Sequence, residues 1–170
     1  MLRVHVYISL TNQFIIKMCL YTRQIMPIKA RRDITCFKVV LALKSQDDFY
    51  LTPFQHMPMR IGEICCAVGP LLPKPTSFTS LERQAGLSKL YYVASGYIHA
   101  FTDEMKAMEY CKVVSGRCAN FDFCVIKCII PKDALYFVST LNEYEICARN
   151  ILPTALLAKY RKGYPVLGDK

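Results

Sequence analysis

The segment 96–130 constrains the fold of this chain more than any other, because its local signals agree at every level. Residues 97–101 form a short apolar run, which indicates a strand. Thr102 has the side chain of a helix N-cap, and apolar residues at a spacing of three and four then predict a helix over about 103–114. The almost wholly apolar segment 121–130 indicates a second strand. The segment is therefore a strand–helix–strand unit.

The remainder of the chain shows mostly strand and turn signals. We expect a central strand, a hairpin partner ended by Pro53, a Gly-containing strand and two late strands, over 34–43, 49–54, 58–68, 134–139 and 144–152. Short helical turns are expected at 81–88 and 154–160, and a Pro-rich surface loop at 69–80. This order predicts an α+β fold: a mostly antiparallel sheet of six to eight strands, with one main helix packed on it.

The length of 170 residues fits one domain, and a hydrophobic share of 53% supplies ample core. We expect a single domain over 18–152, preceded by an edge strand or extension over 1–17 and followed by a basic tail over 153–170. Met18 is an alternative start of translation.

The net charge of +9 lies at the two ends of the chain. Residues 1–44 contain eight Lys or Arg and one Asp, whereas the middle of the chain is close to neutral. A basic end indicates either a solvated surface or contact with nucleic acid. Nucleic-acid contact through the termini is therefore one alternative function.

The nine cysteines are scattered and odd in number, and we expect no signal peptide, because Thr11-Asn12-Gln13 interrupts the first apolar run. This usage is typical of reduced thiols that pack as small apolar residues, so we expect a cytoplasmic protein. No apolar run approaches the roughly 18 residues needed to span a bilayer, so we expect no membrane partner. The spacing of Cys111, Cys118, Cys124 and Cys128 lacks a close zinc knuckle, and no metal is expected.

Several motifs recur together in one order: Met18-Cys-Leu-Tyr-Thr, Tyr50-Leu-Thr-Pro-Phe, Gly96-Tyr-Ile-His-Ala-Phe and Lys127-Cys-Ile-Ile-Pro-Lys. In these motifs the chain resembles a group of small uncharacterised proteins of Bacteroides-type gut bacteria and their phages. The resemblance covers about residues 18–152. It implies a small globular domain in a mobile-element context, and no known reaction.

A first candidate site is a ligand-binding surface on the strand at 97–101. The pleat of a strand directs Tyr97, His99 and Phe101 to one face, where they line a pocket or pack in the core. We add Tyr50, from the earlier strand, and the Pro-rich loop to this binding surface. A histidine acting as a general base also needs an orienting acid, which the sequence does not identify.

A second candidate site is the Glu143-Tyr144-Glu145 triplet, with Thr52 on an earlier strand. ADP-ribosyltransferases use such a Glu-x-Glu pair to orient the ribose of NAD, so NAD is the alternative cofactor. However, the Ser-Thr-Ser of those enzymes is replaced here by Tyr-Leu-Thr-Pro, and no Arg or His stands on the strand at 34–43. The alternative without a function is that Glu143 and Glu145 are two exposed acids at a turn.

The sequence also lacks a phosphate-binding Gly loop, a nucleophile elbow and a metalloprotease His pair. The function predicted first is therefore a non-enzymatic accessory domain of phage or mobile-element type, without a cofactor. Its expected partner is a protein or a small ligand. If there is a site, we expect it where the strand at 97–101 meets the turn at Glu143.

Overall fold

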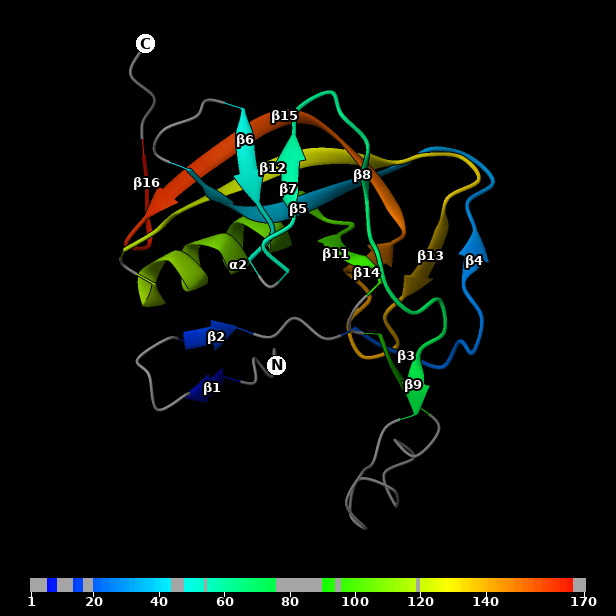
Figure 1. Ribbon diagram of the computed structural model, residues 1–170. Coiled ribbons are helices and arrows are strands. Elements are labelled where there is room, and N and C mark those ends of the chain that lie inside the picture. Colours follow the sequence, from blue (N-terminus) through cyan, green and yellow to red (C-terminus); the bar gives the residue numbers. More distant parts are fainter. Residues whose placement is uncertain are drawn as a thin grey trace.

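The computed structural model describes residues 6–8, 14–16, 20–43, 48–53, 55–75, 90–93, 96–118 and 120–166 (Figure 1). The first half of the chain contributes β1 (Val6–Ile8), β2 (Phe14–Ile16), β3 (Leu20–Thr22), β4 (Ile28–Lys29), β5 (Ile34–Ala42), β6 (Phe49–Leu51), β7 (Pro58–Arg60), β8 (Cys65–Cys66), β9 (Lys74–Pro75) and β10 (Tyr91–Val93). The second half contributes β11 (Ile98–Phe101), α2 (Glu104–Arg117), β12 (Asp122–Ile130), β13 (Leu135–Val138), β14 (Glu145–Ala148), β15 (Asn150–Arg161) and β16 (Tyr164–Pro165).

The main sheet has eleven strands in the described part of the chain, in the order β16-β15-β12-β5-β11-β14-β13-β4 with β6, β7 and β8 beside this path. Its pairs are antiparallel, and α2 packs on one face, so the predicted α+β fold is confirmed. The expected number of six to eight strands was too low. The extra strands are two or three residues long, and such short strands leave no periodic pattern in a sequence.

Helix α2 begins one residue later than expected and ends three residues later. The N-cap is Asp103 rather than Thr102, because the Asp103 carboxylate accepts a hydrogen bond from the Lys106 backbone N–H at 2.9 Å. The buried face of α2 covers an aromatic-rich core on the sheet, formed by Phe37, Val39, Phe101, Ala107, Tyr110, Cys111, Val114, Phe123 and Val125.

Strand β5 is central, as predicted, and its two faces support two different cores. Its partner on one edge is β12, and its other edge is shared by β11 and β6. Phe37 and Val39 face α2, whereas Cys36, Lys38 and Val40 alternate to the opposite face. That opposite face carries a second core, which we call the sulfur-rich core. Its members include Cys36, Val40, Tyr50, Met59, Cys65, Cys124, Ile126, Cys128 and Ile146.

The segment after residue 152 differs from the expectation. Helical turns were predicted over 154–160, but this segment belongs to β15, which pairs with β12 from Ile129 to Asp122. Pro153 does not end the strand, because the register shifts between Lys127 and Cys128, beside it. A proline is tolerated at such an irregularity, where a ladder hydrogen bond is already missing. The expected basic tail therefore begins inside a long strand of the sheet.

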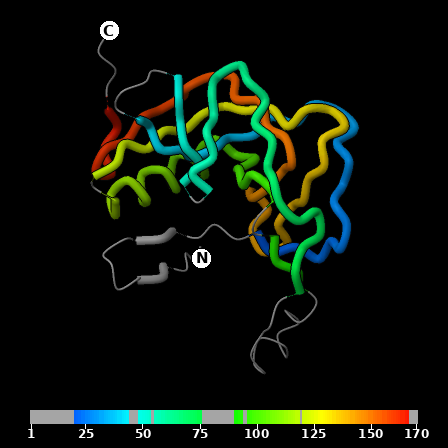
Figure 2. The backbone as a smooth tube through the Cα atoms, in the orientation of Figure 1, coloured from blue at the N-terminus to red at the C-terminus, as the bar shows by residue number. Residues whose placement is uncertain are grey.

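The single strand expected over 58–68 is two short strands joined by a turn. β7 pairs with β6, whereas β8 pairs with β15 on the far side of the sulfur-rich core. Gly62 lies in the turn between them with a φ of +85°, so it serves a turn rather than a strand bulge. Figure 2 shows this part of the chain crossing over the long strands β5, β12 and β15. No ladder joins β7 to β8 in the described part of the chain.

Some expectations lie outside the described residues: the helical turn at 81–88, most of the turn at 45–48, and Met18 with Cys19. Within the described residues, no helix combines the length and the apolar character that crossing a membrane requires.

Candidate functional site

The four residues expected to bind a ligand are all buried, and they divide between three cores. The Tyr97 ring packs edge-on against Phe137, and its hydroxyl donates a hydrogen bond to the Leu71 carbonyl at 2.9 Å. Phe101 packs against Tyr110 beneath α2, while Tyr50 belongs to the sulfur-rich core. His99 lies between Tyr97 and Phe101, opposite Cys147 of β14. These positions form packing contacts rather than one open surface.

The structure places the end of β11 beside the turn at Glu143. Phe101 is paired with Glu145, and the Thr102 N–H donates to the Tyr144 carbonyl at 2.9 Å. Glu145 accepts a hydrogen bond from the Asn142 amide at 3.1 Å, and burial raises the pKa of its carboxyl. Glu143 is exposed. The end of β11 and the turn at Glu143 are therefore adjacent, as the sequence predicted.

Thr52 does not join the two glutamates. Its hydroxyl accepts a hydrogen bond from the Met57 N–H at 3.0 Å, in the turn between β6 and β7. The neighbouring Tyr50 points into the sulfur-rich core, whereas the charge of Glu145 acts on Tyr110 of α2, on the other face of the sheet. A site that uses Glu143, Glu145 and Thr52 together is not assembled in this structure.

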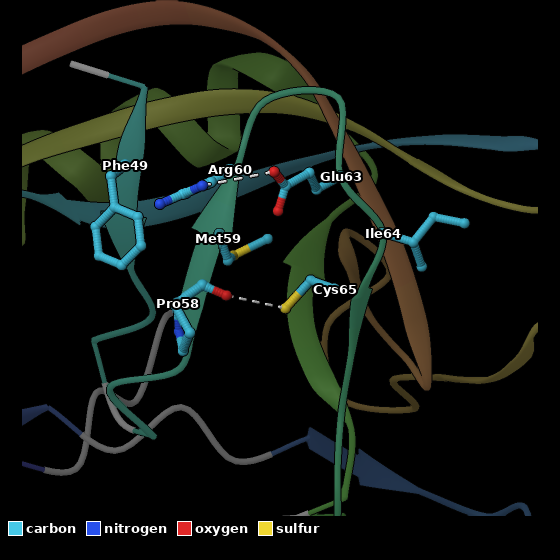
Figure 3. Close-up of a pocket in the computed structure, with 7 residues that line it drawn as sticks. All are labelled: Phe49, Pro58, Met59, Arg60, Glu63, Ile64 and Cys65. Carbon is cyan, nitrogen blue, oxygen red and sulfur yellow. Dashed lines mark hydrogen bonds and ion pairs between the residues drawn. The ribbon is translucent and has the colours of Figure 1, made fainter. Parts of the chain in front are cut away.

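A cavity of about 270 Å³ lies where β7 and β8 separate (Figure 3). Residues of β6 and β7 form one wall; Glu63 of the following turn and Cys65 of β8 point toward it from the other side, whereas the Ile64 side chain points away. The lining residues are Phe49, Pro58, Met59, Arg60, Glu63, Ile64 and Cys65. The sequence did not indicate this cavity, because its two walls separate only when β7 pairs with β6 and β8 pairs with β15.

The mouth of the cavity combines apolar and charged groups. The Arg60 guanidinium lies over the Phe49 ring, 5.3 Å from its centroid, and 3.7 Å from a carboxylate oxygen of Glu63. The Cys65 thiol donates to the Pro58 carbonyl at 3.4 Å and so bridges the two walls. Burial raises the pKa of this thiol, so it is neutral at pH 7. The arrangement suits a flat apolar group with polar contacts at its edge.

Lys38 stands on the face of β5 that carries the sulfur-rich core and is 3% exposed. Cys65 belongs to this core and also lines the cavity, whereas Lys38 is not among the lining residues. Sequence reasoning missed this residue. The available signal was one lysine in an apolar strand, on the same face as Cys36 and Val40.

The described residues contain no group of three or more His, Cys, Asp or Glu side chains placed to hold a metal ion. The basic residues Arg23, Lys29, Arg31 and Arg32 are exposed around β4, where Lys29 pairs with Asp133 at 3.1 Å. Contact of these residues with nucleic acid stays a prediction.

Comparison with models of known families, with curated proteins and with solved structures finds no match for this chain.

Proposed function

We propose that this chain is a non-enzymatic binding domain whose ligand site is the cavity between β7 and β8. The observation that carries the proposal is the cavity itself, with apolar walls and the Arg60–Glu63 pair at its mouth. Ligand sites are concave, mostly apolar and furnished with a few polar groups that orient the ligand. The volume of about 270 Å³ is at the small end for such sites, so the ligand is a small one with a flat apolar part.

The biological setting is also a proposal. The resemblance to proteins of Bacteroides-type bacteria and their phages supports an accessory role in a mobile element, in the cytoplasm of the host. The eight cysteines that the structure describes are free thiols, which fits a reducing compartment.

The test is a thermal-shift and calorimetric screen with mononucleotides and aromatic acids. A ligand at a hundred times its dissociation constant stabilises the folded state by about 2.7 kcal/mol, which raises the melting temperature measurably. The double variant Arg60→Ala/Phe49→Ala is expected to lose the shift. Arg117→Ala, an exposed arginine on α2, is the matched control and is expected to keep it. A wild-type protein that no member of the panel stabilises contradicts the proposal.

A second candidate function is NAD use at Glu145. It is favoured by one observation: a half-buried carboxyl, held by Asn142 and adjacent to the end of β11. This function predicts NAD cleavage that disappears in Glu145→Ala and persists in Thr52→Ala, since the Thr52 hydroxyl is engaged by the Met57 N–H in the turn between β6 and β7. Absence of NAD turnover by the wild-type protein ends this candidate.

A further inference from the structure

Strand β4 is a free edge of the main sheet in the described part of the chain. It stands last in the strand order and pairs with β13 alone, and Figure 1 shows it at the outer margin of the molecule. A free edge presents backbone N–H and C=O groups to which an extended segment of another chain can add as a new strand. β4 is therefore a place where a partner can dock through its backbone.

The backbone hydrogen bonds around β4 show which of its groups face outward. The Ala30 N–H donates to the Ala134 carbonyl at 2.9 Å, so this group of Ala30 faces β13. The Leu135 carbonyl, opposite Lys29, accepts from the Arg149 backbone N–H of the next segment at 2.8 Å and so faces away from β4. Neighbouring residues of an antiparallel strand alternate in direction. The N–H and C=O of Lys29 therefore face away from β13, towards an incoming strand.

Large apolar side chains are exposed beside this edge. Ile25 and Met26 are 59% and 64% exposed, and Ile28 of β4 is 39% exposed. Val138 of β13, which is 40% exposed, belongs to the same place, because its N–H donates to the Gln24 side chain at 3.1 Å. Single exposed apolar residues are common, but a group of them along a free edge marks an interaction surface.

The charged groups around the edge are mostly basic. The segments 21–33 and 131–140 run side by side and hold five bases and two acids, namely Arg23, Lys29, Arg31, Arg32, Lys132, Asp33 and Asp133. Asp133 pairs with Lys29 at 3.1 Å, and the Asp33 carboxylate accepts from the Lys132 N–H at 2.8 Å. No ion pair among the described residues involves the exposed Arg23, Arg31 or Arg32. This excess of positive charge complements an acidic partner.

The same charge argues against a second copy of this chain as the occupant, because pairing β4 with its own copy would bring two basic segments together. A nucleic acid would use the arginines but would leave the strand edge and the apolar side chains without a role. We propose that β4 docks an extended acidic segment of another protein. The segment adds as a strand beyond β4, with its apolar side chains against Ile25, Met26 and Ile28 and its carboxylates towards Arg31 and Arg32. This surface is separate from the cavity between β7 and β8.

The experiment measures binding of the full chain to an acetylated eight-residue peptide of alternating glutamate and valine, by fluorescence anisotropy. Arg31→Glu/Arg32→Glu is expected to weaken binding at least tenfold. Lys112→Glu/Arg117→Glu makes the same change of charge at exposed positions of α2 and is expected to stay within twofold of wild type. A peptide with serine in place of valine is expected to bind at least fivefold more weakly. Melting temperatures confirm that both variants are folded.

Backbone pairing is tested separately. The peptide is expected to slow hydrogen exchange of the Lys29 N–H at least tenfold. Of two peptides N-methylated at alternating residues, the one whose methyl groups face β4 is expected to lose binding and the other to keep it.

Four results overturn the proposal. The wild-type protein does not bind the peptide; both methylated peptides bind equally; or the α2 variant loses as much affinity as Arg31→Glu/Arg32→Glu. In the fourth, an oligothymidylate of the same length binds more tightly than the peptide and loses its affinity in Arg31→Glu/Arg32→Glu, which assigns the arginines to nucleic acid.

Discussion

Asp122 and Arg161 form a two-armed ion pair across strands β12 and β15, with hydrogen bonds of 2.6 and 2.5 Å. Lys159 adds a third contact to the same carboxylate at 3.3 Å. The carboxylate is 4% exposed, whereas both cations are more exposed and are screened by water. The pair fixes the ends of the two longest paired strands, in the part of the chain where the sequence suggested a basic tail.

Asp122→Asn is expected to lower the free energy of unfolding by about 1–2 kcal/mol, a value reduced for the solvent exposure of the partners. The hydrogen bonds from Arg161, followed by that from Lys159, hold the pKa of Asp122 below its ordinary value of 3.8. This stabilisation is therefore present above about pH 4 and is lost as the pH falls through the lowered pKa. Urea unfolding at pH 7 and pH 3 measures it. Asp133→Asn, which breaks the exposed pair with Lys29, is the control with little expected effect; an equal loss in both variants contradicts the prediction.

Gly96 is expected to tolerate substitution less well than Gly62. Its φ is +88°, and an added Cβ would lie 2.3 Å from the Pro70 carbonyl oxygen. Gly62 has a similar φ of +85° but nothing within 4 Å of its Cβ position. Gly62→Ala should therefore cost about 1–2 kcal/mol from backbone strain alone, and Gly96→Ala distinctly more. Equal midpoints of urea unfolding for the two variants would show that the chain near Pro70 moves away freely.

Arg149 ties the strand β11 to the segment that leads away from β8. Its Nη1 donates to the Gly96 carbonyl at 2.8 Å and to the Gly69 carbonyl at 3.0 Å. Arg149→Met is expected to cost about 1–2 kcal/mol and to speed cleavage by chymotrypsin after Leu71, which is exposed. Arg117→Met removes an exposed arginine without these contacts and serves as the control. Unchanged cleavage in Arg149→Met, followed by mass spectrometry, would argue against this tether.

The predictable parts of the fold are the elements whose sequences carry a long, regular apolar pattern. Strands β5 and β12 have continuous apolar runs, and α2 has its apolar spacing, so all three were identified close to their observed bounds. The continuation of β15 past Leu152 was missed because Pro153 usually ends pairing, whereas here it stands at a register shift. The error was one of context, since the partner strand decides whether a proline is tolerated.

The candidate site was less predictable than the fold for a similar reason. Tyr97, His99 and Phe101 alternate to one face as expected, but α2 covers Phe101 while Phe137 covers Tyr97. Whether a face is open depends on which distant segments cover it, and short strands such as β7 and β8 carry no signal of this. Lys38 shows what sequence inspection does offer: a charge on the apolar face of a central strand marks a position to examine.

Lys38→Met is expected to stabilise the ligand-free protein. Burial lowers the pKa of Lys38 from 10.5 to about 8, and this shift corresponds to about 3 kcal/mol of cost for the charged form in the folded state. The unfolded chain binds more protons at this site between pH 8 and 10.5, so the lysine's contribution to stability rises with pH in that window. The excess stability of Lys38→Met over wild type should be full below about pH 8 and shrink towards pH 10.5. Taking the difference between the two proteins cancels the titration of thiols common to both.

Lys127→Met makes the same substitution at an exposed position of β12 and is expected to change stability by no more than about 0.5 kcal/mol at any of these pH values. Urea unfolding of the three proteins at pH 7, 8.5 and 10 measures the differences. A destabilised Lys38→Met at pH 7 would mean that the lysine has a compensating partner in the core and is a structural cation.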